Sequence, residues 1–421
     1  MMTRLTVFTI FCLLGLYPSL TQAKSKAKDC LLNLKKDLHS GHPLILQLDA
    51  PDFLYPNEAK LKIPVNTTAL RVACPAGFIT VKAAQTNRSI AAVECSLKGK
   101  FQFAGDDDSI PALFSIKDLK CSLGAQSSSR LLPSGNNSTL SYAEIGIQLT
   151  IINGNVTETQ FIPTIQELAS GELLDNQQVR WSRARVAPTI LQREIMKLLP
   201  AYRKGVFSPE IDMDPAYVRA NQRTRFLEIF NDTALVDKYL SEAENKYLVQ
   251  GQLITAENLF YEAQQESAYV YDNVLPVWQV INGPGGNWRL VDDLIRSHAT
   301  ISKEGLNIWS GGYMQLYLED SQGEEQLIEL TNGLTIPQFL FKYVHDPAKN
   351  RGLVFITINN PNLERARIDD IICEKYSACD VLHPEFLDPS RGLTYCCRLE
   401  SFKDQALLFG LPSFPDAQPL I

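Results

Sequence analysis

The sequence has no excess of positive charge and no second long apolar run. Its 421 residues carry 40 Lys and Arg against 47 Asp and Glu, a formal net charge of −7. This balance argues against a nucleic-acid-binding protein that is basic over its whole surface. It is compatible with a local basic groove. After residue 23 no segment is long and apolar enough to span a bilayer. No internal repeat is present, and the length allows two or three globular domains.

The first residues have the order of a secretory signal peptide. Arg4 precedes an apolar run from Leu5 to Leu16, and Ala23 ends a stretch suited to cleavage. The run is too short to cross about 30 Å of hydrocarbon as a membrane anchor. The sequence therefore predicts a signal peptide over residues 1–23 and a secreted, extracellular protein.

The cysteines lack the Cys-x-x-Cys pairs that are typical of zinc sites. Cys12 leaves with the predicted signal, and the other eight form two groups of four. In an oxidising compartment this even count favours disulfides. The adjacent Cys396 and Cys397 are expected to pair with Cys373 or Cys379 and not with each other; the connectivity is otherwise open. The predicted disulfide cysteines are Cys30, Cys74, Cys95, Cys121, Cys373, Cys379, Cys396 and Cys397.

Glycosylation sequons agree with a secreted chain, and five of the six precede residue 160. This clustering indicates that the first region exposes much loop surface. The predicted acceptors are Asn66, Asn87, Asn136, Asn137, Asn155 and Asn231.

The apolar pattern changes at about residue 160. Before it, short alternations broken by Pro, Gly, Asn and Asp predict strands, and we interpret residues 24–158 as a β-rich domain stapled by two disulfides. After it, helical and strand-like patterns mix, which predicts an α+β domain over residues 159–421. The expected helices are Pro188–Leu199, Thr224–Ser241 and Trp288–His298, and the expected strands include Tyr269–Leu275, Leu306–Leu318 and Gly352–Asn359.

Six stretches carry a recognisable pattern: residues 247–253, 273–282, 286–292, 336–342, 358–361 and 392–397. Their order and spacing resemble the DNA/RNA non-specific endonuclease family, most of all its secreted arthropod branch. The resemblance covers about residues 160–400, and the N-terminal region is similar to the leader domain of that branch.

The resemblance implies a ββα-metal (His-Me finger-like) nuclease domain that acts on DNA or RNA with Mg²⁺. In such a site a His deprotonates water, Mg²⁺ stabilises the leaving oxygen, and Arg neutralises the phosphate. Carried over to this chain, Asn282 is the metal ligand and Asp292 replaces the family's usual Glu. Asn273 helps to order the site, and Trp288 supports it. The Gly283–Gly286 spacer is longer than is usual in the family.

The chain departs from the family where the chemistry needs a base. It reads Gln250-Gly251-Gln252 where the family reads Arg-Gly-His, so both the phosphate-binding guanidinium and the base are missing. A Gln amide can orient water but cannot accept its proton at physiological pH. Losing a general base is expected to cost about 10²- to 10⁴-fold in rate. His298 falls six residues after Asp292, so on a helix it faces another direction.

Several of these residues also have structural interpretations. Trp278 and Trp288 fall among apolar positions and fit a core better than a base-stacking platform. Asn282 and Asn287 flank a Gly-rich turn, where a helix cap is the alternative role. The basic residues Arg223, Arg225, Arg289 and Arg296 fit either a phosphate groove or solvated helix charges.

Three functions are weighed against each other. The first is a secreted endonuclease-like protein that binds nucleic acid and Mg²⁺ with lost or strongly reduced phosphodiesterase activity. The second is an active Mg²⁺-dependent nuclease with a non-standard base. The third is an interaction module that uses the fold as a scaffold. The sequence does not indicate which oligomeric state the protein adopts.

Overall fold

A computed structural model describes residues 28–420 except 51, 105–112, 125, 134–139, 154–155, 173–177, 194, 332 and 409–413. The predicted signal peptide and the sequons at Asn136, Asn137 and Asn155 lie outside the described residues. Asn66, Asn87 and Asn231 are all exposed.

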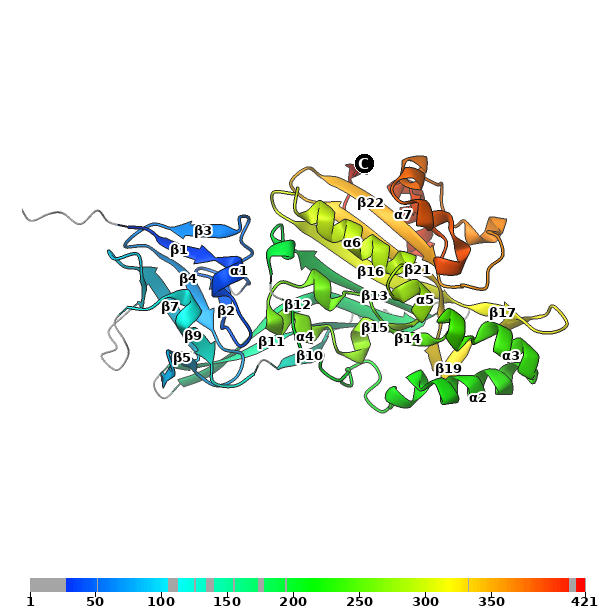
Figure 1. Ribbon diagram of the computed structural model, residues 1–421, viewed down its shortest axis with the longest axis horizontal. Helices are drawn as coiled ribbons and strands as arrows, with labels where there is room; N and C mark the ends of the chain where they lie inside the picture. Colours follow the sequence, from blue (N-terminus) through cyan, green and yellow to red (C-terminus); the bar gives the residue numbers. More distant parts are fainter. Residues whose placement is uncertain are drawn as a thin grey trace, which may run out of the picture.

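The N-terminal region consists of short antiparallel strands, as predicted (Figure 1). In β7 buried positions alternate with half-buried ones, which is the pattern of a strand with one face on a core. The strands are β1 (Cys30–Asn33), β2 (Leu44–Gln47), β3 (Lys60–Ile63), β4 (Thr68–Ala73), β5 (Ile79–Val81), β6 (Ala84–Gln85), β7 (Ile90–Cys95), β8 (Phe101–Phe103) and β9 (Leu119–Cys121), with the short helix α1 (Leu34–Asp37).

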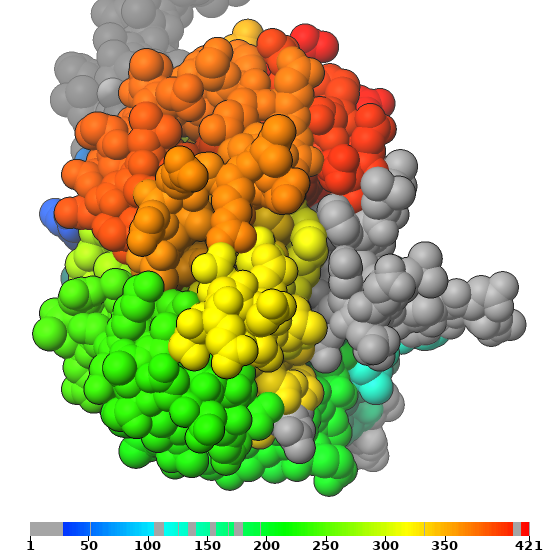
Figure 2. All heavy atoms as spheres, turned by 90° about the vertical axis from the view of Figure 1, so that its right-hand side faces the viewer, coloured from blue at the N-terminus to red at the C-terminus, as the bar shows by residue number. Residues whose placement is uncertain are grey.

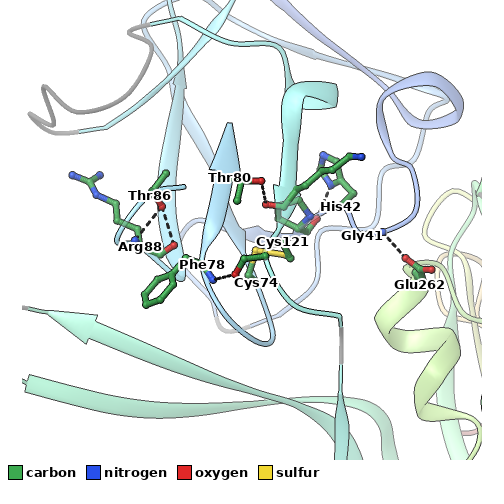
Figure 3. Close-up of a disulfide and its surroundings, with 12 residues drawn as sticks. Gly41, His42, Cys74, Phe78, Thr80, Thr86, Arg88, Cys121 and Glu262 are labelled. Carbon is green, nitrogen blue, oxygen red and sulfur yellow. Dashed lines mark hydrogen bonds between the residues drawn. A yellow bond between two sulfur atoms is a disulfide. The ribbon is translucent and has the colours of Figure 1, made fainter. Parts of the chain in front are cut away.

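Four disulfides join the eight predicted cysteines, two within each group. Cys30 bonds to Cys95 and Cys74 to Cys121 in the N-terminal region, and Figure 3 shows the second bond. Cys373 bonds to Cys397 and Cys379 to Cys396 near the C-terminus. The adjacent cysteines therefore bond to separate upstream partners, as expected.

A nine-stranded sheet runs through the centre of the molecule (Figure 1). Ten consecutive residues of β21 are buried, because the sheet is covered on both faces there. Residue 158, where a domain boundary was predicted, lies within β12, so strands on either side of it share this sheet. The sheet order is β10 (Ser127–Leu132), β11 (Leu140–Asn153), β12 (Val156–Glu172), β13 (Gln178–Val186), β16 (Leu306–Gln315), β21 (Pro337–Asp346), β22 (Arg351–Ile358) and β23 (Thr394–Cys397), with β24 (Gln418–Pro419) parallel to β22.

Two of the predicted helices differ from the structure. The segment expected as one helix from Thr224 to Ser241 is two, α2 (Arg219–Phe230) and α3 (Thr233–Tyr239). Asn231 separates them in the left-handed conformation, at φ 49°, and Asp232 caps α3 by accepting from the Leu235 amide at 3.0 Å.

The helix expected from Pro188 to Leu199 is wrong. Its described residues contain only a 3₁₀ turn, Ile190–Gln192. Ile190 is buried, whereas Leu198 and Leu199 are 85% and 73% exposed. A short amphipathic helix needs an apolar partner surface, and this segment has none along most of its length.

The end of the molecule seen in Figure 2 combines three segments. Helices α2 and α3 appear in green, the β17 (Tyr317–Glu319) and β18 (Glu325–Leu327) hairpin in yellow, and the disulfide-bonded C-terminal segment in orange. The short strands β19 (Glu329–Thr331) and β20 (Leu334–Thr335) follow the hairpin, and helix α7 (Leu399–Leu408) follows β23.

The N-terminal strands contact the rest of the chain through helix α4 (Glu262–Ser267). The Glu262 carboxylate accepts from the Ser40 hydroxyl at 2.8 Å. It also accepts from the Gly41 amide at 2.7 Å, as Figure 3 shows. The Phe53 and Tyr261 rings stack with their centroids 5.8 Å apart. Among the described residues, no helix has the length and apolar character needed to cross a membrane.

Candidate functional site

Two antiparallel strands and a helix position the predicted site residues. Strand β14 (Leu248–Gln252) pairs with β15 (Val274–Trp278), which places Gln252 opposite Val274. Helix α6 (Asn287–Ala299) follows and buries one face against the large sheet (Figure 1). This is the ββα arrangement that the resemblance implied, and α6 confirms the helix predicted at Trp288–His298.

Asn273 fixes the backbone that follows β14. Its side chain is fully buried. Its Oδ1 accepts from the Ile254 amide at 3.0 Å, and its Nδ2 donates to the carbonyls of Ile254 and Ala268 at 2.9 and 3.2 Å. This satisfied amide holds the backbone between β14 and β15, and the ordering role that the resemblance gave to Asn273 stays a prediction.

The strand predicted from Tyr269 to Leu275 begins later, at Val274. Tyr271–Asn273 form a 3₁₀ turn, and Asp272 accepts from the backbone amides of Val206 and Phe207 at 2.7 and 3.1 Å. These bonds satisfy the backbone amides of a loop that lies 65 and 66 positions earlier in the chain, and they hold Asp272 out of the strand pairing.

A glycine-rich turn connects α5 (Gln279–Asn282) to α6. Gly286 is the N-cap of α6, so neither Asn282 nor Asn287 caps this helix, and the capping interpretation is wrong. Asn287 is instead fully buried, and its Nδ2 donates to the Gly392 and Glu385 carbonyls, each at 2.7 Å. A Cβ on Gly286 would lie 2.1 Å from the Ile281 oxygen, which explains a glycine at this position.

One pocket of about 510 Å³ contains the four predicted chemical positions, Gln250, Gln252, Asn282 and Asp292. The rest of the lining comes from the extended segment at 195–202, from the loops that follow β14 and α4, and from α4 and α6. The other lining residues are Ile195, Met196, Leu199, Pro200, Tyr202, Thr255, Ala256, Glu257, Gln265, Tyr269, Arg289 and Arg296.

Gln252 has one satisfied and one unsatisfied end. Its Oε1 accepts from the Ala256 amide at 3.0 Å. The hydroxyls of Tyr202 and Tyr269 interact with the Gln252 amide, but no described atom makes a well-formed hydrogen bond with Nε2, which is buried. Burial raises the pKa of both tyrosines, so the hydroxyls stay protonated. The pocket therefore presents neutral polar groups where a base was expected.

Asp292 is held by a buried cation. Its Oδ1 accepts from Lys342 Nζ at 2.6 Å and from Asn258 Nδ2 at 2.8 Å. Lys342 has no exposed side-chain surface, and its ammonium lies 4.2 Å from the centre of the Trp288 ring. Burial lowers the pKa of Lys342, and the Asp292 carboxylate opposes this by favouring the charged form.

Sequence reasoning gave Lys342 no role at the site. The signal was a single Lys in the otherwise apolar run at 339–344, because a charge in a buried strand needs a partner. Trp278 and Trp288 are 0% and 1% exposed and belong to the core, as expected.

Two of the four predicted basic residues line the pocket, and both contact Glu257. Arg289 Nη2 lies 2.9 Å from Glu257 Oε1, and Arg296 Nη2 lies 2.9 Å from Glu257 Oε2. Arg296 also contacts Asp293 and donates to Asn258 Oδ1 at 3.1 Å. The remaining pair of arginines lies elsewhere: Arg223 contacts Asp237, and Arg225 contacts Glu228 and Glu329.

No histidine is among the described residues that line this pocket. The His298 ring is half-buried, and burial lowers its pKa. His39 and His42 line a different cavity beside the N-terminal strands. His345 lies on β21, where its Nε2 is 3.1 Å from Asn350 Oδ1.

A Mg²⁺ ion that keeps most of its water is the cofactor that the resemblance implies for this pocket, with Asn282 as its ligand. The Asn282 amide makes no hydrogen bond with the described residues and lines the pocket. A hard oxygen of this kind suits Mg²⁺, which is commonly held by one or two protein oxygens. The described residues hold no group of three or more His, Cys, Asp or Glu arranged for a metal, and Lys342 already offsets the Asp292 charge. Any such ion would therefore be held weakly.

Residues 201–402 match the DNA/RNA non-specific endonuclease family. A salivary protein, Tsal1 of Glossina morsitans morsitans, is 26% identical over 196 residues, or 46% of this chain and 47% of that protein. A salivary endonuclease of Lutzomyia longipalpis is 28% identical over 158 residues, or 37% of this chain and 38% of that protein. The matched segments thus span less than half the length of these relatives.

The crystal structure of the EndoG/EndoGI complex aligns with 45% of this chain and 74% of that chain. Its sequence identity is 11% and its TM-score is 0.26. This likeness is too weak to support a conclusion about fold or function. The resemblance in the nuclease motifs is therefore supported by the family match and the salivary relatives.

Proposed function

We propose that this chain is a secreted, endonuclease-like protein that binds DNA or RNA in the pocket around Gln252 and has lost, or nearly lost, phosphodiester hydrolysis. The observation that carries the proposal is the convergence of Gln250, Gln252, Asn282 and Asp292 on one pocket. By the resemblance, these four positions correspond to the family's functional residues, and Gln252 stands where the family has its base.

The described residues around the pocket offer no replacement base. Gln252 Oε1 already accepts from Ala256 N, and its amide nitrogen is not basic. The tyrosines nearby are held protonated by burial. Asp292 is engaged by Lys342 and Asn258, and Glu257 by Arg289 and Arg296. Bulk hydroxide alone would then act on a bound phosphodiester, and its concentration at neutral pH is low.

The direct experiment incubates the secreted protein with plasmid DNA and with RNA in the presence of Mg²⁺ or Mn²⁺. We expect binding without cleavage, or cleavage slower by about 10²-fold or more than that of a His-containing family member. Turnover equal to such a relative, abolished by Asn282→Ala, would contradict the proposal.

The restoring variant combines Gln250→Arg with Gln252→His. We expect it to show measurable cleavage, because the imidazole would enter the same pocket as Asn282. Gln265→His is the matched control, since it adds a histidine to the same pocket away from β14. Equal cleavage by the two variants would mean that position 252 is not the base position.

Two alternatives remain distinct from this proposal. An active nuclease with a recruited base predicts cleavage that survives in Gln252→Ala. An interaction module built on the N-terminal strands predicts no binding to DNA or RNA even at low salt, where phosphate contacts are strongest. We propose secretion from the predicted signal, the salivary relatives and the four disulfides.

A further inference from the structure

Glu257 bridges the two arginines of the pocket with its two carboxylate oxygens. Oε1 contacts Arg289 Nη2 and Oε2 contacts Arg296 Nη2, each at 2.9 Å. A phosphate group would use its oxygens in the same way, because guanidinium groups bind carboxylates and phosphates through the same donors. We infer that Glu257 is an internal competitor of phosphate for Arg289, and that it weakens the binding of phosphate groups in this pocket.

Among the described residues that line the pocket, Glu257 is the carboxylate that contacts arginine, which supports this inference. The lining contains two basic residues, Arg289 and Arg296, and two acidic ones, Glu257 and Asp292. Behind them, Lys342 offsets Asp292. With Gln250 neutral and both arginines engaged by Glu257, the described lining offers a phosphate no guanidinium that is free of a carboxylate. The inference rests on the proposed function, in which this pocket receives nucleic acid.

The two arginines differ in how firmly they are held. Arg296 is 7% exposed and keeps Asp293 and Asn258 as further partners. Arg289 is 40% exposed, and Glu257 is its only partner among the described residues. Removing the Glu257 charge would therefore release Arg289 and leave Arg296 in place.

The test uses Glu257→Gln, which keeps the shape of the side chain and removes its charge. The probes are inorganic phosphate and a single-stranded oligothymidylate of about eight nucleotides, within the site sizes typical of single-strand binding. We expect phosphate affinity to rise on the order of tenfold, since hydrogen bonds to charged groups are the stronger ones. We also expect the salt dependence of oligonucleotide binding to steepen by about 0.7 in log–log slope, because Arg289 would then neutralise one more phosphate.

Asp293→Asn is the matched control. It changes the net charge by the same amount and removes a carboxylate from Arg296, but Asp293 does not line the pocket. A rise in affinity confined to Glu257→Gln, and lost again in Glu257→Gln with Arg289→Gln, supports the inference. Equal rises in both carboxylate variants, or none in Glu257→Gln, would overturn it.

Inorganic phosphate separates this inference from the proposed function. If the wild type binds no DNA or RNA, the proposed function fails, while increased phosphate binding in Glu257→Gln still supports the role of Glu257. If that variant does not fold, Arg289→Gln alone decides. Because Glu257 occupies Arg289 in the wild type, Arg289→Gln is expected to leave phosphate affinity unchanged. A fall in phosphate affinity in this variant would contradict the inference.

Discussion

At position 252 this chain has the amide of a Gln where the family has the imidazole of a His. The two side chains have similar reach, but only the imidazole can take up a proton near neutral pH. The Gln252 side chain is fixed by Ala256 N at one end and surrounded by neutral hydroxyls at the other. A polar but proton-neutral group of this kind favours ligand binding over hydrolysis. In the proposed function the site lacks its base, while Asn273 still holds the neighbouring backbone through its hydrogen bonds.

A second feature at the residue scale is the buried pair of Lys342 and Asp292. Lys342→Met would leave the Asp292 carboxylate buried without its cation. We expect the free energy of unfolding to fall by about 3–5 kcal/mol, because an unpaired buried charge is not compensated by water. Urea unfolding measures the change.

The control for this prediction is the double variant Lys342→Met with Asp292→Asn. It removes both charges and is expected to recover most of the lost stability, because no charge is then left unpaired. A single variant that unfolds within about 0.5 kcal/mol of the wild type, as surface substitutions do, would mean that the pair is not buried in solution.

At the scale of elements, the turn between α5 and α6 connects the segments that bring Asn282 and Asp292 to one pocket. In Gly286→Ala the new Cβ would meet the Ile281 oxygen at 2.1 Å and its carbonyl carbon at 2.4 Å. These are backbone atoms, so we expect a loss of about 1–3 kcal/mol or more. Thermal unfolding measures it. Gly124→Ala, with nothing within 4 Å, is the control and is expected to be near neutral.

Elements with strong local patterns were predictable from the sequence, and those determined by long-range partners were not. The strand at Gly352–Asn359 and helix α6 appear within one residue of the expected bounds. The pattern at Pro188–Leu199 is helical by spacing, but most of its apolar side chains find no surface to pack against. Asn231 and Asp232 supplied a local break that spacing alone did not reveal.

The candidate site was predictable only where the family motifs extend. These gave Gln250, Gln252, Asn282 and Asp292, which do share a pocket. Glu257 and Lys342 come from segments 35 and 50 residues away from Asp292 in the chain, and their pairing depends on tertiary packing. The apolar run around Lys342 indicates that its charge needs a buried partner, but no local pattern identifies Asp292 as that partner.

At the scale of the whole molecule, His42 lies beside the contact between the N-terminal strands and α4. Burial lowers the pKa of His42 from 6.5 to about 4, although the carbonyls of Pro43 and Ile116 oppose this shift. Between these two pH values the unfolded chain takes up a proton that the folded chain excludes. Stability is therefore expected to fall as the pH drops from 6.5 to 4, by about 3 kcal/mol from this group.

Urea unfolding at several pH values tests this dependence. His42→Gln is expected to flatten the pH profile in that range, whereas His39→Gln, at the neighbouring ring, is expected to leave the slope in place. Parallel profiles for the wild type and His42→Gln would show that other groups control acid stability.

The long strand β12 also bears on how this protein can be divided. Cutting the chain at residue 158, between the two predicted domains, would remove β11 and leave one edge of β12 without its hydrogen-bonded neighbour. That edge includes the fully buried Ile162, Ile165 and Leu168. An uncovered apolar edge of this kind recruits other chains. A nuclease-like fragment designed to start at 159 would therefore tend to aggregate, and one that keeps β10 and β11 would not.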